Sequence, residues 1–315
     1  MTTSSNLIIV QKTGGMAPDV VQAIGQQLGS APLPAVNADA AATGATAAPN
    51  GQAATHGEAA LNGSTSLPSL LRWQAPEQAP AVFDAWASQF GVDAANVPGG
   101  LDLSAFRLLA IDMDSTLVTM ETLDEIADMA NLKAEVSAIT EAAMRGEIRD
   151  FTESLTRRMA LLEGVGEDLI ERVYQERLHL SPGAETLLAA ARAAGLKIML
   201  VSGGFTHFTD RLRDRLGLDF AFANQFDIVD GKLTGRVLGP IVDGAFKAQA
   251  VQECCRAMGF HPSQAIAVGD GANDLGMMGV AGLSVGYHAK PVVREQARWS
   301  VRVGGLDTVA RWLGA

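Results

Sequence analysis

Cysteine, long apolar runs and positive charge are all scarce in this sequence. Its two cysteines, Cys254 and Cys255, are adjacent within a helical pattern, which excludes a disulfide framework and favours a reducing compartment. No apolar run approaches the ~20 residues that span a bilayer, and the N-terminus lacks the basic start and apolar core of a secretion signal. We therefore expect a cytoplasmic protein that does not enter a membrane.

Basic residues are outnumbered by acidic ones, with 24 Lys and Arg against 35 Asp and Glu and a net charge of −11. This excess argues against general binding to nucleic acid or to an anionic membrane. It does not argue against a phosphorylated substrate, because a metal ion together with Lys and Arg can reverse the field inside a pocket. A chain of 315 residues is long enough for two domains. A homodimer is left open beside a monomer.

The first hundred residues form a small unit of their own by composition. Short elements are expected there, namely strands at 6–11 and 67–74 and helices at 16–28 and 77–90. Residues 30–66 are rich in Ala, Gly, Thr, Asn and Pro and have almost no large apolar side chains, so we predict a disordered linker. An alanine-rich helix is the alternative. The expected βα unit thus comprises residues 1–29 and 67–100, and regulatory binding of an amino acid stays open.

Strand and helix patterns alternate from Phe106 onward. Strands are expected at 107–112, 196–201, 264–268 and 282–285, and helices at 183–194, 205–216, 244–258 and 306–313. This alternation predicts an α/β fold with a doubly wound parallel sheet, formed by residues 104–121 and 181–315. Residues 122–180 are helical in pattern and too long for a plain crossover, so we predict an inserted helical cap. Asp230-Gly231 predicts a hairpin turn within 226–237.

Two apolar runs end in acidic residues. Leu108–Ile111 leads into Asp112 and Asp114, which point the same way in an extended chain and can converge on one substrate. Residues 265–269 lead into Asp270, Asn273 and Asp274. Mg²⁺ binds a few carboxylate oxygens together with phosphate and water. The two strand ends therefore predict a Mg²⁺-dependent phosphoryl-transfer site.

Ser202-Gly203-Gly204 lies between these motifs, after an apolar run and before a helix. A hydroxyl, two glycines and a helix N-terminus make a cradle for an anion, although a serine there also serves as an ordinary helix cap. Lys247 lies at the start of a later helix and could neutralise the charge of a phosphate. The alternative is that Lys247 is an ordinary solvated surface lysine. Lys232 of the hairpin is the competing candidate for the phosphate-binding lysine.

The motifs at 112–116 and 269–274, with the segment at 201–204 and Lys247 between them, resemble the haloacid dehalogenase (HAD) superfamily of phosphatases. Within it, residues 104–315 are similar to the phosphoserine phosphatase family. The resemblance implies a HAD-like Rossmannoid core with a small helical cap at 122–180. It also selects Lys247 over Lys232.

The resemblance also implies a role for each acidic residue. Asp112 would be the nucleophile that forms an aspartyl-phosphate, and Asp114 the general acid and base. Mg²⁺ would be held by the carboxylates of Asp112 and Asp270 and by the backbone carbonyl of Asp114. Asp274 would support the metal shell, and Asn273 would bind phosphate or metal-bound water.

Two further residues would select the substrate by this resemblance. Glu121 would receive the ammonium of phosphoserine and Arg158 its carboxylate, which agrees with the chemistry of both groups. Arg157 is adjacent, so the assignment could shift by one, and Phe151 would help to wall the pocket. Ordinary surface charge is the alternative for Glu121 and Arg158.

We therefore expect hydrolysis of O-phospho-L-serine to L-serine and phosphate, the last step of serine biosynthesis. One alternative is another capped HAD phosphomonoesterase acting on a different small metabolite. Another is a non-catalytic, phosphate-responsive regulator. The five histidines have no metal-ligand spacing and are interpreted as structural.

Overall fold

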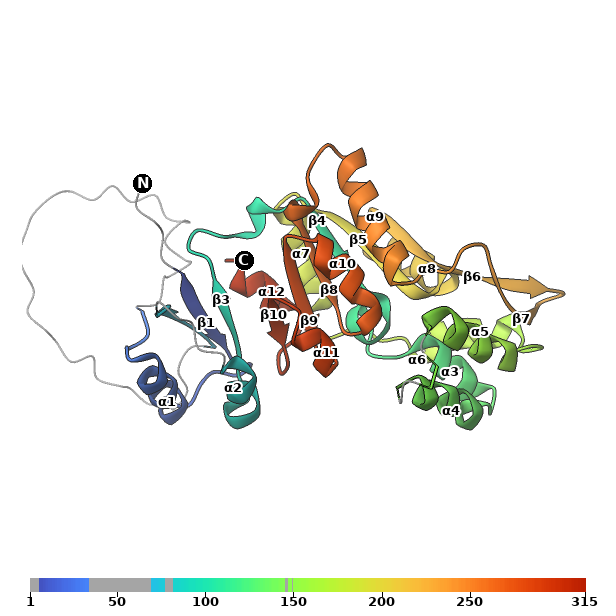
Figure 1. Ribbon diagram of the computed structural model, residues 1–315, viewed down its shortest axis with the longest axis horizontal. Coiled ribbons are helices and arrows are strands. Elements are labelled where there is room, and N and C mark those ends of the chain that lie inside the picture. Colours follow the sequence, from blue (N-terminus) through green and yellow to red (C-terminus); the bar gives the residue numbers. More distant parts are fainter. Residues whose placement is uncertain (1–5, 34–68, 77–81, 145–146, 149) are drawn as a thin grey trace, which may run out of the picture. The chain divides into compact units, whose positions relative to one another are not determined.

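The computed structural model describes residues 6–33, 69–76, 82–144, 147–148 and 150–315, in two units that comprise 1–99 and 100–315 (Figure 1). Within these described ranges, no helix combines the length and the apolar character needed to cross a membrane. Almost all of the linker predicted at 30–66 lies outside the described residues, as does the start of the helix predicted at 77–90.

The first unit contains a three-stranded antiparallel sheet in the order β2-β1-β3. Its elements are β1 (Leu7–Gln11), α1 (Pro18–Leu28), β2 (Leu70–Gln74), α2 (Phe83–Phe90) and β3 (Asp93–Val97). Ile8, Trp73 and Trp86 are buried together in its core. Strand β3 was not expected, because Asp93-Ala-Ala-Asn-Val97 has little intrinsic β propensity; its pairing with β1 and the burial of Ala94 and Val97 compensate.

The second unit is built on a seven-stranded sheet in the order β10-β9-β8-β4-β5-β6-β7 (Figure 1). The strands are β4 (Leu108–Ile111), β5 (Lys197–Phe205), β6 (Phe220–Val229), β7 (Lys232–Leu238), β8 (Ala265–Gly269), β9 (Leu283–Tyr287) and β10 (Trp299–Val301). All neighbouring pairs are parallel except β6 and β7. The doubly wound parallel sheet predicted from the alternation is therefore confirmed. Strand β10 and the first half of β6 were not predicted.

Six helices of this unit accompany the sheet: α7 (Ala184–Ala193), α8 (Thr206–Leu216), α9 (Gly244–Ala257), α10 (Leu275–Val280), α11 (Pro291–Arg294) and α12 (Asp307–Trp312). Residues of α9 and α10 pack in one cluster with Leu108 and Ala110 of β4, whereas α7 and α8 contact β5. Strands β4 and β8 are buried along their whole length. Such central strands are apolar throughout and present polar groups only where they end.

Among the described residues between β4 and β5 there are four α-helices, namely α3 (Thr122–Met129), α4 (Lys133–Met144), α5 (Phe151–Leu161) and α6 (Glu167–Arg177). They pack against one another and form the green group of helices in Figure 1. The α5–α6 connection bonds to the β6–β7 hairpin, because Gly164 N donates to Leu233 O at 2.8 Å and Leu233 N to Val165 O at 2.8 Å. The hairpin thus supports the end of α5.

Candidate active site

The carboxyl ends of β4 and β8 place two aspartates side by side. Ile111 of β4 is in register with Val268 of β8, and Asp112 N donates to Val268 O at 3.0 Å. Asp112 and Asp270 therefore leave adjacent parallel strands at the same edge of the sheet. Both are nearly enclosed, with 4% and 7% of their surface exposed.

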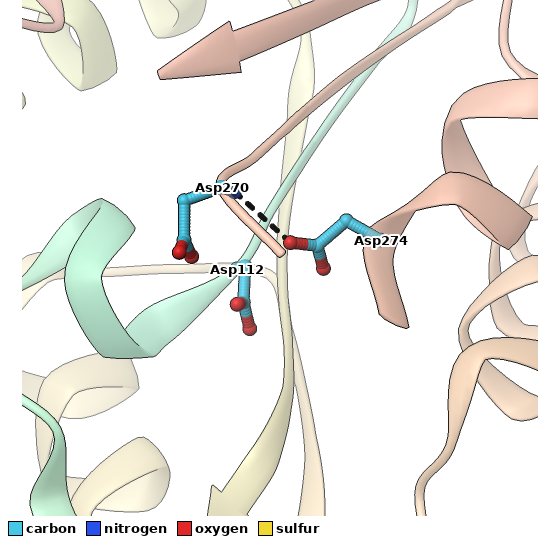
Figure 2. Close-up of side chains that lie close together, drawn as sticks. All are labelled: Asp112, Asp270 and Asp274. Carbon is cyan, nitrogen blue, oxygen red and sulfur yellow. Dashed lines mark hydrogen bonds between the residues drawn. The ribbon is translucent and has the colours of Figure 1, made fainter. Parts of the chain in front are cut away.

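Lys247 joins Asp112 to Asp274. Its Nζ donates to Asp112 Oδ1 and to Asp274 Oδ1, both at 2.7 Å, and the side chain is fully buried. Lys247 is therefore not a solvated surface lysine, whereas the competing Lys232 is exposed on the hairpin. The second oxygen of Asp274 accepts the backbone N–H of Asp270 at 3.0 Å (Figure 2). It also accepts the backbone N–H of Gly271 at 3.0 Å. Protein groups therefore engage both oxygens of Asp274.

The carboxylates of Asp112, Asp270 and Asp274 offer oxygen atoms that all lie within 4.8 Å of one another (Figure 2). Because Asp274 is committed to Lys247 and the backbone, Asp112 and Asp270 are the carboxylates suited to a cation. Thr116 Oγ1 donates to Asp270 Oδ1 at 3.2 Å and orients that group. A cluster of hard oxygen donors of this kind fits a divalent ion such as Mg²⁺.

Burial and neighbouring charges raise the pKa values of Asp112 and Asp270. Burial, followed by the charge of Asp274, holds the pKa of Asp112 well above its usual range, although Lys247 opposes this. Burial raises the pKa of Asp270 to about 6, with Lys290 opposing and Asp274 adding to the shift. Burial also disfavours the charge of Lys247, but the two bonded carboxylates outweigh it and raise its pKa. Three carboxylates thus surround the single ammonium group of Lys247. An additional cation would therefore stabilise the site.

Asp114 lies on a tight turn immediately after β4. Ser115 adopts a left-handed backbone conformation with φ of 53°, and the turn lets Asp114 Oδ1 accept Thr122 N at the start of α3, at 3.0 Å. Burial raises the pKa of Asp114 to about 7, and the charge of Glu121 adds to the shift. Glu121 itself accepts a hydrogen bond from Ser115 Oγ at 2.8 Å. A carboxyl group with a pKa near 7 can both donate and accept a proton at neutral pH.

The Ser202-Gly203-Gly204 loop closes another side of the site. Ser202 is fully buried, and its Oγ accepts Gly204 N at 2.8 Å. A Cβ added at Gly204 would lie 2.7 Å from Asp114 Oδ2, and one added at Gly203 would lie 2.7 Å from Phe151 Cζ. The two glycines therefore let the loop lie directly against the acid of the core and the aromatic ring of α5.

Arg158 and Arg157 differ in their surroundings on α5. Arg157 is exposed and pairs with Glu153 at 2.5 Å. Arg158 is half-buried, and its Nε is enclosed without a hydrogen-bond partner among the residues that the structure describes. Glu121 and Arg158 both act electrostatically on the pKa of Asp124, with opposite sign. The two residues predicted to bind substrate therefore lie near a common neighbour.

Other predicted and unpredicted residues complete the site. Asn273 is half-buried in the loop after β8, where its Oδ1 faces Gly271. Lys290, which lies 3.8 Å from Asp270 Oδ2, was not predicted. Asn224 was also missed, although a polar residue directly after the apolar residues 220–223 was a usable signal. It bonds to Gly203.

The sequence is similar to that of known hydrolases. The family model of haloacid dehalogenase-like hydrolases matches residues 109–279. A phosphoserine phosphatase from Polaromonas sp. strain JS666 is 58% identical over 211 residues, which is 66% of this chain and 89% of that relative.

Two solved structures are also similar. A probable phosphoserine phosphatase from Vibrio cholerae, in unliganded form, has a TM-score of 0.75 at 31% identity, covering 99% of this chain and 87% of that one. A phospho-aspartyl intermediate analogue of phosphoserine phosphatase has a TM-score of 0.63 at 36% identity, covering 66% of this chain and 99% of that one. With its acidic strand ends, buried lysine and these matches, the chain belongs to the haloacid dehalogenase-like hydrolases, among relatives that are phosphoserine phosphatases.

Proposed function

We propose that this chain is a phosphoserine phosphatase that hydrolyses O-phospho-L-serine to L-serine and phosphate, the last step of serine biosynthesis. The observation that carries the proposal is the buried Lys247, bonded to Asp112 and Asp274 beside Asp270. This arrangement occurs in a chain that is 58% identical to a phosphoserine phosphatase over 211 residues.

Asp112 is the nucleophile of the proposed reaction. Lys247 favours its ionised form from 2.7 Å and neutralises negative charge as the phosphoryl group approaches. A carboxylate oxygen of Asp112 bonds to phosphorus while the bond from phosphorus to the serine oxygen breaks. The product is an aspartyl-phosphate, an intermediate whose analogue is known in the similar structure described above.

Asp114 moves the protons. Its pKa of about 7 lets the carboxyl group carry a proton at neutral pH, and it gives this proton to the serine oxygen as that oxygen leaves phosphorus. The carboxylate left behind then takes a proton from water, and the water oxygen attacks phosphorus to release phosphate and Asp112. The hydrogen bond from Thr122 N keeps one oxygen of Asp114 in place, and the other lies beside the 202–204 loop.

We propose Mg²⁺ as the cofactor, held by the carboxylates of Asp112 and Asp270 and the backbone carbonyl of Asp114. Asp274 would support this shell through its bonds to the backbone of Asp270 and Gly271. When bound, the ion would supply positive charge to phosphate oxygens. Ser202, Gly203 and Asn273 would contact the phosphate around it.

Glu121 and Arg158 would select the amino-acid part of the substrate. The enclosed, unpaired Nε of Arg158 suits a carboxylate, and Glu121 suits an ammonium. We propose that α3–α6 act as a cap over the core and that the enzyme works in the cytoplasm. The division into cap (122–180) and core (104–121 and 181–315), and that of the N-terminal unit around its linker, belong to the same proposal.

The test is phosphate release from a panel of substrates, with Mg²⁺ and with EDTA. The panel contains phospho-L-serine, phosphothreonine, phosphoethanolamine, glycerol phosphate and an aryl phosphate, and the folded Asp112→Asn variant serves as the inactive control. Strong Mg²⁺-dependent preference for phosphoserine is expected. Equal rates on all members would point to another capped phosphomonoesterase, and activity in Asp112→Asn would contradict the nucleophile.

A further inference from the structure

The pairing of β5 with β6 is interrupted at the phosphate loop. Val201 is in register with Phe222 and Phe205 with Asn224, so residues 202–204 are opposed by a single residue of β6. Residues that bulge out of a ladder lose their regular partners, and their carbonyl groups must find others when buried. The loop therefore needs a group from outside the ladder to hold it.

The side chain of Asn224 supplies that group. Its Nδ2 donates to Gly203 O at 2.7 Å, and its Oδ1 accepts Val242 N at 2.8 Å. Only 1% of Asn224 is exposed. Both ends of this buried amide are thus bonded to backbone in two different segments.

These bonds fix one peptide unit of the loop at both of its ends. The carbonyl of Gly203 is held by Asn224 at 2.7 Å, and the N–H of Gly204 is held by Ser202 Oγ at 2.8 Å. Since carbonyl and N–H belong to one planar peptide, its orientation is determined. Gly204 in turn lies against Asp114.

The second bond of Asn224 reaches the helix that carries the catalytic lysine. Val242 precedes Asp243, whose side chain accepts Phe246 N at 2.8 Å and caps α9. Lys247 follows within the first turn of α9. One side chain therefore connects the phosphate loop with the start of the helix that places Lys247.

We propose that Asn224 is a positioning residue that sets the phosphate loop against Asp114 and aligns it with Lys247. It contacts neither substrate nor reacting atoms, and it acts through Gly203 and Val242. This inference rests on the proposed function, because it assigns Asn224 to the phosphate subsite of that reaction.

Asn224→Asp tests the proposal with almost no change of shape. The carboxylate still accepts Val242 N, but it has no N–H for Gly203 O and repels that carbonyl. We expect kcat/KM for phosphoserine to fall about tenfold to hundredfold, because a buried carbonyl loses its partner. Competitive inhibition by inorganic phosphate should weaken about tenfold.

The control is Thr308→Val, which removes an equally buried polar group from α12. We expect it to leave kcat/KM and phosphate inhibition within about twofold of the unchanged chain, since α12 packs against α7 and carries no residue of the proposed site. Thermal unfolding of all variants separates lost positioning from lost stability. If Asn224→Asp does not fold, Asn224→Ser removes the amide without adding charge and takes its place.

The proposal is overturned if the folded Asn224 variant keeps the phosphate inhibition constant and kcat/KM of the unchanged chain. It is also overturned if its losses equal those of Thr308→Val at the same melting temperature. Failure of the proposed function would appear separately, as an unchanged chain that does not hydrolyse phosphoserine with Mg²⁺.

Discussion

Four aspartates crowd the site, and Lys247 bonds directly to two of them, Asp112 and Asp274. Asp114 relies on the start of α3, and Asp270 on Thr116 and the more distant Lys290. Each carboxyl group thus has its own environment, and burial raises the pKa values of Asp112, Asp114 and Asp270. The chemistry of the site depends on these differences between residues of the same type.

The raised pKa values predict how stability depends on pH in the metal-free protein. The pKa of Asp270 is about 6 and that of Asp114 about 7, both above 3.8. Between about pH 4 and pH 7 the folded state therefore binds more protons than the unfolded state. The free energy of unfolding falls as the pH rises through this range. We expect Mg²⁺, which competes with those protons, to raise the melting temperature more at pH 7.5 than at about pH 5.

Thermal unfolding with EDTA and with Mg²⁺ at the two pH values checks this expectation. Asp270→Asn is the matched variant, because its amide neither titrates nor offers a charged ligand. It should reduce both the rise in melting temperature on adding Mg²⁺ and the dependence of the melting temperature on pH. An equal Mg²⁺ shift at both pH values would count against carboxylates that titrate at the metal site.

The neighbouring arginines of α5 predict a difference in substrate selection. Arg158→Ala should raise KM for phosphoserine by about tenfold to hundredfold and affect an aryl phosphate much less, because a carboxylate loses its charged partner. Arg157→Ala, which removes an exposed arginine paired with Glu153, is the matched control. It should leave KM unchanged for both phosphoserine and the aryl phosphate. Steady-state kinetics on both substrates decide. Equal losses on the two substrates for Arg158→Ala would exclude a carboxylate-binding role.

Among the elements, the β6–β7 hairpin has a role that goes beyond the sheet. It bonds to the α5–α6 connection through Gly164, Val165 and Leu233, and β7 lies beside α5 in Figure 1. A two-stranded hairpin alone is marginally stable, so the helices stabilise it as much as it supports them. The orientation of α5, and with it Arg158 and Phe151, therefore depends on this contact.

Two glycines of this region allow the contact to be tested. Gly235 has φ of 77° and its added Cβ would lie 3.2 Å from Ala160 Cα, whereas Gly239 has φ of 73° and nothing within 4 Å. Alanine costs about 1 kcal/mol at both for the left-handed backbone, but only Gly235→Ala also pushes against α5. We expect Gly235→Ala to lower the melting temperature further and to raise KM for phosphoserine. Equal effects of the two variants would show that the hairpin does not position α5.

For the whole molecule, the two units differ in what they contribute. Every site residue predicted from the sequence lies from Asp112 to Asp274, and these residues and Lys290 all belong to the unit of residues 100–315. The Polaromonas relative matches over 89% of its own length while covering 66% of this chain. The match thus accounts for nearly all of that relative and leaves a third of this chain outside it.

We therefore predict that residues 100–315 alone fold and hydrolyse phosphoserine. Their seven-stranded sheet contains only strands of this unit, and the buried cluster around β4 only its residues, so kcat should stay within about twofold of the full chain. Circular dichroism and phosphate release with Mg²⁺ check this, with the full chain as control. A folded but inactive fragment would show that residues 1–99 take part in catalysis.

Local patterns in the sequence determined much of the fold and part of the site. Apolar runs that lead into Asp112 and Asp270 predicted two acidic strand ends, because a buried parallel strand is apolar until it leaves the sheet. Periodicity separated helices from strands to within a few residues. Strands β3 and β10 escaped this reasoning, since one has little β propensity and the other is three residues long.

Only the tertiary structure decided how the parts of the site meet. Lys247 reaches Asp112 across 135 positions of the chain, and Asn224 reaches Gly203 because of a break in strand register. No local pattern encodes such distances or registers, because they follow from how whole elements pack. The raised pKa values of Asp114 and Asp270 have the same origin, since burial and neighbouring charges exist only once the chain has folded.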